Sequence, residues 1–262
     1  MQNEESKITE NRIEGRNAVL EAFRSGKTID KLYVLDGCQD GPVKSITREA
    51  RKHDTIINYV AKERLDQLSE TGKHQGVIAV SAAYEYAEVE DILAAAEAKG
   101  EAPFIIILDG IEDPHNLGAI IRTANQAGAH GVIIPKRRAV GLTPTVARTS
   151  AGAINYTPVA KVTNISNTMK ELKDKGMWFV CADMDGTRMY DLDLTGPIGL
   201  VIGNEGDGVS PLVKKNCDMV ASIPMKGDID SLNASVATGV LAYEIVRQRI
   251  NKGEYLGEKD AI

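Results

Sequence analysis

The sequence predicts an α/β protein in which a larger parallel-sheet domain follows a small α/β domain. Apolar runs such as FIIIL (104–108) and IGLVI (198–202) have the length and β-branched content of strands buried on both faces. Segments with helical spacing separate these runs, and several runs end in loops rich in Gly, Asp and Asn. This alternation is typical of βαβ units around a parallel sheet, here of about six strands.

The first part of the chain reads as a separate small domain. Residues 1–11 are polar, and we expect a flexible terminus there. Residues 12–83 alternate helices (17–23, 42–53, 65–69) with strands (31–35, 56–60, 76–81). Such a domain can bind RNA, but it can equally serve dimerisation or stability. Residues 84–102 are acidic and alanine-rich, and they form the expected linker with a short helix at 89–98.

The larger domain is expected to span residues 103–262. Its first helix, 115–127, places apolar residues at core-facing spacing, which leaves Arg122 on a different face. The other expected helices are 165–175 and 234–250. A helix also begins after Ser210-Pro211, a good N-cap and first-turn pair. The expected strands are 104–108, 131–134, 156–160, 177–182, 198–202 and 219–223.

Composition limits the classes of protein that fit. No apolar run approaches the roughly 20 residues that cross a bilayer, and the first residues lack the apolar core of a signal peptide. We therefore expect a cytoplasmic protein without a membrane partner. The net charge of -6 argues against a general nucleic-acid binder, but residues 12–83 carry a net charge of +2, which permits a local RNA-binding patch. The three cysteines (Cys38, Cys181, Cys217) show no disulfide or metal-ligand spacing, so no metal site is expected.

The stretch IGLVIGNEGDGVS, residues 198–210, is the centre of the predicted site. Three glycines after a buried strand allow unusual backbone angles and a close approach of ligand to main chain. Ligands of open α/β sheets bind at the carboxyl ends of strands, where Glu205 would lie. The stretch is neither a P-loop nor a GxGxxG fingerprint. A simple strand-to-helix turn with solvated acids explains it equally well when it is taken alone.

Two further loops at strand ends carry polar residues of the same kind. The first holds Asn116 and Arg122, and the last holds Ser231 and Asn233. Each has a structural alternative: Asn116, Ser231 and Asn233 are all good helix caps, and Arg122 could pair with a surface acid. The functional interpretation gains weight because all three loops should open at one edge of a parallel sheet.

Three segments resemble the signatures of the SpoU/TrmH (SPOUT) family of RNA ribose 2′-O-methyltransferases. They read DGIEDPHNLGAIIRTA (109–124), IGNEGDGVS (202–210) and IPMKGDIDSLNASVA (223–237), in the order that the family has. The match covers residues 103–250. The N-terminal segments IEGRNAVLEAF and HQG resemble the RNA-binding domain of the RlmB branch, which methylates a guanosine in the peptidyl-tRNA-binding loop of bacterial 23S ribosomal RNA.

This resemblance implies a site, a cofactor and an assembly. S-adenosylmethionine would be the methyl donor, and the fold would be a knotted α/β domain that forms a homodimer. By position, the cofactor would lie against main chain at Gly203, Ile223 and Leu232. The catalytic set would be Asn116, Arg122, Glu205, Ser231 and Asn233.

Other functions stay open at this stage. The same chemistry could act on another rRNA or tRNA nucleotide. A non-catalytic RNA-binding ribosome-assembly factor, or an enzyme acting on small nucleotides, could keep the same fold. The basic cluster Lys136 to Arg138, together with Arg148, is a candidate for contact with the RNA backbone, although a solvated basic face explains it as well.

Overall fold

The computed structural model describes residues 11–228 and 231–254. The chain divides into two compact units. One comprises residues 1–85 with 141–145, and the other comprises residues 86–140 with 146–262. Except for Asn11, the predicted flexible terminus lies outside the described residues.

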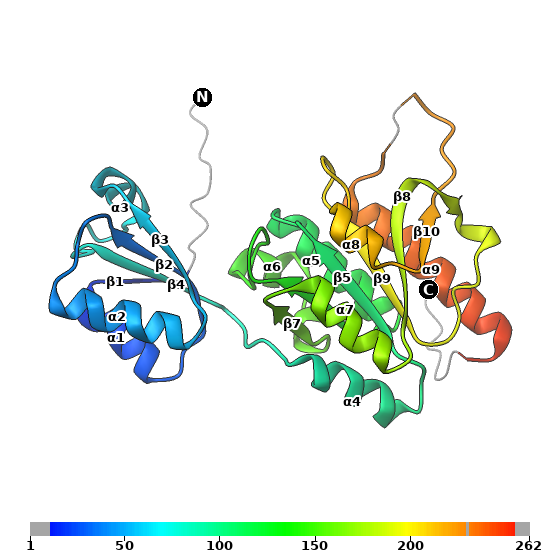
Figure 1. The fold of residues 1–262 in the computed structure, drawn as a ribbon, viewed down its shortest axis with the longest axis horizontal. Helices are drawn as coiled ribbons and strands as arrows, with labels where there is room; N and C mark the ends of the chain where they lie inside the picture. The colour runs from blue at the N-terminus through cyan, green and yellow to red at the C-terminus, as the bar shows by residue number, and fades with distance from the viewer. Residues whose placement is uncertain (1–10, 229–230, 255–262) are drawn as a thin grey trace. The chain divides into compact units, whose positions relative to one another are not determined.

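The N-terminal unit is a four-stranded mixed sheet of order β1-β4-β2-β3 (Figure 1). Strands β2 and β3 are parallel, and β4 pairs antiparallel with β1 and β2. The strands are β1 (Arg12–Glu14), β2 (Ile29–Leu35), β3 (Ile56–Val60) and β4 (Val77–Ser81). The helices are α1 (Arg16–Arg24), α2 (Gly41–Lys52) and α3 (Lys62–Leu68). The sequence predicts all of these except β1, whose three residues are too few for a periodic pattern.

The two faces of this sheet are covered by different helices. Helices α1 and α2 bury Val19, Ile46 and other apolar side chains against Leu32 and Val34 of β2. Helix α3 covers the opposite face, where Leu65 packs against Ile78. Alternate residues of a strand point to opposite faces, so the unit has two apolar layers with the sheet between them.

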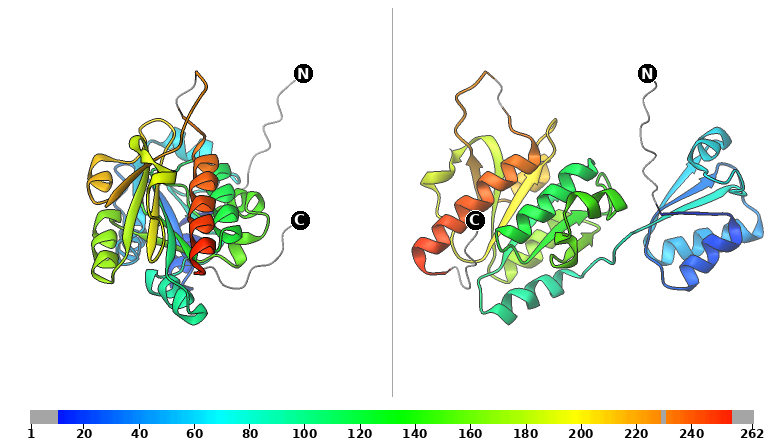
Figure 2. Two further views of the ribbon diagram at one scale, coloured as in Figure 1. Left: turned by 90° about the vertical axis from the view of Figure 1, so that its right-hand side faces the viewer. Right: turned by 180° about the vertical axis from the view of Figure 1, so that it is seen from behind.

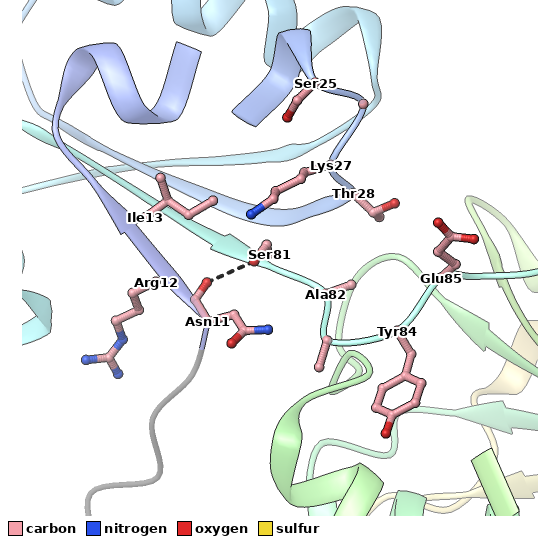
Figure 3. A pocket seen from close by; sticks show the side chains of 12 residues that line it. Asn11, Arg12, Ile13, Ser25, Lys27, Thr28, Ser81, Ala82, Tyr84 and Glu85 are labelled. Atoms are coloured by element: carbon pink, nitrogen blue, oxygen red, sulfur yellow. Dashed lines mark hydrogen bonds between the residues drawn. The ribbon is translucent and has the colours of Figure 1, made fainter. Parts of the chain in front are cut away.

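A cavity of about 480 Å³ lies in the N-terminal unit beside β1 and the end of β4 (Figure 3). At the cavity wall, the Oγ of Ser81 donates a 3.1 Å hydrogen bond to the carbonyl of Asn11. Lys27, in the turn after α1, also lines the cavity. None of the residues predicted for catalysis or cofactor binding lines this cavity.

The second unit is a six-stranded parallel sheet of order β10-β8-β9-β5-β6-β7, with helices on both faces (Figures 1 and 2). Its strands are β5 (Phe104–Asp109), β6 (Gly131–Pro135), β7 (Val159–Val162), β8 (Trp178–Arg188), β9 (Ile198–Gly203) and β10 (Met219–Ser222). Its helices are α4 (Val89–Lys99), α5 (Pro114–Gln126), α6 (Pro144–Thr149), α7 (Ile165–Asp174), α8 (Pro211–Lys215) and α9 (Ala234–Lys252). Helix α6 begins at Pro144 in the segment assigned to the other unit, and its later residues belong to this one.

The central prediction, a parallel sheet of about six strands, is confirmed. The strand predicted at 156–160 is displaced in the structure, because a short 3₁₀ turn occupies Ala153–Asn155 and Tyr156 is 80% exposed. Strand β8 continues to Arg188, well beyond the predicted end at 182, with a register irregularity opposite Val220/Ala221 of β10. The chain knot stays a prediction, since strand order and register alone do not define how the chain is threaded.

The helix expected in the linker packs on the second unit. Ile92 of α4 is fully buried among Ile105, Ile133 and other residues of the sheet. A side chain at Gly131 would meet the Ile92 side chain at 2.5 Å, so β6 needs glycine at this close approach. Helix α4 therefore covers one face of the parallel sheet.

A buried histidine directly before β6, which contacts the first residue of β5, should make folding stability depend on pH. His130 Nδ1 accepts the N–H of Phe104 at 3.0 Å, and Nε2 lies 3.1 Å from a Glu101 carboxylate oxygen. An accepting Nδ1 belongs to the neutral ring, whose proton then sits on Nε2. Burial lowers the pKa of His130 below its ordinary 6.5, Lys99 and Arg249 lower it further, and Glu101 opposes them.

Because this pKa is lower in the folded state, the stabilisation is complete above pH 6.5 and is lost as the pH falls below it. We expect a smaller free energy of unfolding in urea at pH 5 than at pH 7.5, changing by at most about 1.4 kcal/mol per pH unit from this group. The variant His130→Gln should reduce the difference, whereas His53→Gln, at an exposed position, should keep it. Equal pH dependence in both variants would contradict the assignment.

Candidate active site

Three polar side chains from distant parts of the sequence meet at the carboxyl edge of the parallel sheet. Asn116 lies in the first turn of α5, Glu205 lies in the loop after β9, and Asn233 is the N-cap of α9. The Nδ2 of Asn116 donates to Glu205 Oε1 at 2.5 Å, and Nδ2 of Asn233 donates to the same oxygen at 3.1 Å. Asn233 Nδ2 also lies 2.9 Å from Asn116 Oδ1. The predicted convergence of three strand-end loops is therefore observed for these residues.

The alternative that Asn116 only caps its helix is wrong. Asp113 is the N-cap of α5, and its side chain accepts the N–H of His115 at 2.9 Å. Asn116 is 7% exposed. Its amide nitrogen donates to Glu205, and its amide oxygen accepts from Asn233. Asn233 does cap α9, because its Oδ1 accepts the N–H of Ser235, while its amide nitrogen donates to Glu205.

The loop that carries Glu205 is shaped by two residues that the sequence analysis did not single out. Asn204 Oδ1 accepts the N–H groups of Gly206 and Asp207 at 2.8 and 2.6 Å, which folds the loop beneath Glu205. Asp109, buried at the end of β5, accepts the N–H of Ser210 at 2.9 Å. The sequence could have indicated both residues by their position at the ends of adjacent strands, because short polar side chains there often bind nearby backbone groups.

Two predicted catalytic residues lie outside the hydrogen-bonded cluster. Arg122 is exposed on α5, and its side chain has no hydrogen bond or ion pair with any other described residue. Ser231 is also exposed, in the segment before α9, and its side chain makes no hydrogen bond within the described part of the chain. The structure thus unites Asn116, Glu205 and Asn233 and leaves these two side chains facing solvent.

The basic segment after β6 is held at the same edge of the sheet. Lys136 N donates to Val162 O at 2.8 Å, and Val140 N donates to Ile111 O at 3.0 Å, which ties the segment to the loop before α5. Arg137 and Arg138 are exposed, and neither pairs with an acid in the described ranges. Arg138 also adopts a positive φ of 53°.

Comparison with known proteins identifies the family. Residues 103–243 match the model of the SpoU rRNA methylase family, and residues 12–87 match a model described as RNA 2′-O ribose methyltransferase substrate binding. The chain belongs to the SpoU family. It is 49% identical over 241 residues to the TrmH family protein YacO of Bacillus subtilis, with 92% of this chain and 96% of that protein covered.

Solved structures of SpoU proteins agree with this assignment. The methyltransferase AviRb from Streptomyces viridochromogenes, solved with S-adenosylmethionine, aligns with a TM-score of 0.59 and 28% identity over 92% of this chain and 90% of its own. An rRNA methyltransferase from Sinorhizobium meliloti, also solved with this cofactor, aligns at 0.57 and 25% identity over 90% and 86%. This SpoU protein is an RNA 2′-O-ribose methyltransferase that acts on tRNA or rRNA and uses S-adenosylmethionine.

The residues predicted to hold the cofactor fit such a ligand. Gly203 ends β9, Ile223 follows β10 directly, and Leu232 precedes α9, so all three stand at the edge that carries the Asn116 cluster. All three are half-buried, which offers main chain and apolar side chains together, as an adenine ring requires. Within the described residues no helix is long and apolar enough to cross a membrane, and no group of acidic, His or Cys side chains is arranged to hold a metal.

Replacing Gly203 with alanine should disrupt the SpoU loop itself. A Cβ at this position would overlap the backbone of Gly208 and Val209, so the loop can close only over a glycine. We expect Gly203→Ala to lower the free energy of unfolding by about 1–3 kcal/mol, measured in urea without cofactor. Gly206→Ala is the matched control, since its Cβ would meet only Asn204 Oδ1 at 3.6 Å, and should change stability by less than about 0.5 kcal/mol. Equal stability of the two variants would contradict this packing.

Proposed function

We propose that this protein methylates the ribose 2′-hydroxyl of a guanosine in the peptidyl-tRNA-binding loop of bacterial 23S ribosomal RNA. It would act in the cytoplasm as a homodimer. The observation that carries the reaction is the cluster of Asn116, Glu205 and Asn233 at the sheet edge. Support for the substrate comes from the N-terminal unit, whose match is to a substrate-binding model.

The two N-terminal segments that resemble the RlmB branch meet in the structure. Arg16 N donates to Gln75 Oε1 at 3.2 Å, and Arg16 Nε donates to the Gln75 carbonyl at 3.1 Å. Gln75 takes a positive φ of 50°, which is uncommon for a residue other than glycine. This joint arrangement of IEGRNAVLEAF and HQG supports the proposed branch.

In the proposed mechanism the side chains mainly align the reacting groups. When bound, S-adenosylmethionine supplies an electrophilic methyl group. Arg122 contacts an RNA phosphate and the developing 2′-alkoxide through its guanidinium fork. A guanidinium stays protonated in proteins and is a poor base, so the hydroxyl proton leaves to phosphate or water.

The clustered residues act as positioning groups in this mechanism. Glu205 holds the amides of Asn116 and Asn233 and accepts the N–H of Ala234 at 3.4 Å, which fixes the start of α9. Ser231 would order the cofactor-binding segment. Arg137 and Arg138 would contact the RNA backbone beside the reaction centre, while Lys136 and Arg148 are further candidates.

Methyl transfer to unmodified large-subunit rRNA tests the proposal. Full-length protein is incubated with labelled S-adenosylmethionine and the RNA, and the product is mapped by ribose-methylation sequencing, with Arg122→Ala as control. We expect one new 2′-O-methylguanosine in the peptidyl-tRNA-binding loop, absent from the control. Methylation at another rRNA or tRNA position would overturn the substrate. Cofactor binding without methylation of any RNA would overturn the reaction and favour an assembly factor.

A further inference from the structure

One helix face of the N-terminal unit concentrates positive charge. Lys44, Arg48, Arg51 and Lys52 of α2 follow the spacing i, i+4, i+7, i+8, so they share one side of the helix. All four are exposed, whereas Val43, Ile46 and Ala50 on the other side are buried. Helix α2 therefore turns its apolar side to the sheet and a nearly continuous row of cations to solvent.

A single acid neutralises this row only in part. Glu49, half-buried beside it, lies 2.9 Å from Lys52 Nζ and 3.9 Å from Arg48 Nε. Lys44 and Arg51 have no acidic partner among the described residues. A row of exposed cations with so few acids favours a polyanion, since each phosphate neutralised releases bound counterions.

An aromatic side chain stands beside this helix on the same face of the sheet. Strand β3 is the edge of its sheet and lies next to α2. Ile57 packs with the α1–α2 layer, and Tyr59, two residues further along, points to the same face and is 52% exposed. Exposed aromatic rings next to cations are typical of proteins that stack unpaired bases while they hold the backbone.

The opposite face of the unit lacks this pattern. Helix α3 carries Lys62 and Arg64, but Lys62 is paired with Asp66 at 3.0 Å and Arg64 is bonded to Gln67 at 3.3 Å. Glu63 on the same helix adds further negative charge. Helix α2 therefore carries four cations and one acid, whereas α3 carries two cations and two acids, so positive charge is concentrated on the α2 side of the sheet.

We propose that the N-terminal unit binds RNA through the surface formed by Lys44, Arg48, Arg51, Lys52 and Tyr59. The cations contact consecutive phosphates of a single-stranded or looped segment, and Tyr59 stacks on one of its bases. This inference rests on the proposed function in so far as the substrate is RNA, but it does not depend on which nucleotide is methylated. The surface contributes affinity for RNA, and the chemical step stays with the second unit.

The test compares two matched double variants of the full-length protein. Lys44→Ala/Arg51→Ala removes two cations from α2, and Lys62→Ala/Arg64→Ala removes two from α3. Binding to an unmodified large-subunit rRNA transcript, and to bulk tRNA as a second probe, is measured between 50 and 300 mM salt. We expect the α2 variant to lose about tenfold in affinity and to reduce the slope of log K against log salt by about 1.5. The α3 variant should bind like the unmodified protein.

Stacking by Tyr59 is tested separately. Tyr59→Ala should weaken RNA binding about tenfold, and Tyr59→Phe should retain it, because the ring alone stacks.

In methyl-transfer assays the α2 variant should raise KM for RNA and leave both kcat and KM for S-adenosylmethionine unchanged. Thermal unfolding of every variant should match the unmodified protein, since all the altered side chains are exposed.

These experiments distinguish a failure of the proposed RNA-binding surface from a failure of the proposed function. If the α2 and α3 variants bind RNA equally well, the proposal for this surface is wrong, whichever nucleotide is methylated. If the unmodified protein methylates no RNA but the α2 variant alone loses RNA affinity, the proposed function fails and the surface stands. An α2 variant with lower kcat and unchanged RNA affinity would also overturn the inference.

Discussion

Arg122→Ala is expected to lower kcat for RNA methylation by about 10²- to 10³-fold while leaving the fold intact. Removal of one donor aimed at developing negative charge costs this much in other enzymes. Arg122 is exposed on α5 and has no partner in the described part of the chain, so its loss should not change the free energy of unfolding. Single-turnover methyl transfer at saturating RNA and cofactor measures the effect. A variant within threefold of the normal rate would remove Arg122 from the mechanism.

The variant Arg122→Lys separates a fork contact from a simple positive charge. Lysine keeps the charge but lacks the planar pair of donors that bind two oxygens together. We expect Arg122→Lys to remain close to Arg122→Ala in kcat. Near-normal turnover would show that charge alone suffices, and the bidentate role would then be wrong. Arg24→Ala, at an exposed arginine of the other unit, controls for a general loss of positive charge.

The parallel sheet could be predicted because its strands are long apolar runs. Phe104–Asp109 is buried at every position, and a run of this kind fits few structures other than a central parallel strand. The displaced β7 and the missed β1 have a different cause. Val159–Val162 is only partly buried, and Arg12–Glu14 has three residues, so neither presents enough periodic pattern to locate its ends.

The site could be predicted only in part, for a related reason. Glycine-rich and polar loops at strand ends indicate where Asn116, Glu205 and Asn233 gather, because the carboxyl ends of parallel strands share one edge. Which atoms then pair depends on loop geometry that no local pattern encodes. Asn204 folds the Glu205 loop through two backbone bonds, and Asp109 ties that loop to β5, yet both look like ordinary turn residues in sequence.

The cluster itself yields the second large effect, through Asn116→Asp. This change replaces the amide that donates to Glu205 with a carboxylate at 2.5 Å, at a buried position that faces the exposed Glu205. Two carboxylates at this distance cannot both be ionised, so they must share a proton or move apart. We expect kcat/KM near pH 8 to fall at least about 100-fold, with partial recovery at lower pH as the pair takes up a proton. The unmodified protein should show no such recovery.

A second substitution then tests whether the contact or the charge matters. In the Asn116→Asp background, Glu205→Gln restores one donor and one acceptor with their positions exchanged. Asn233 can still donate to the carboxylate at position 116, but the amide nitrogen at position 205 no longer accepts from Asn233. We expect this double variant to regain part of the activity near pH 8, giving a coupling energy of about 1–3 kcal/mol in a double-mutant cycle. Glu205→Gln alone should lower kcat with little change in the pH–rate profile, because Glu205 acts by position. If the double variant stays as slow as Asn116→Asp, the contact between positions 116 and 205 is not what the activity depends on. If Glu205→Gln alone shifts the profile, then Glu205 itself exchanges the proton and is the base rather than the residue that positions Asn116.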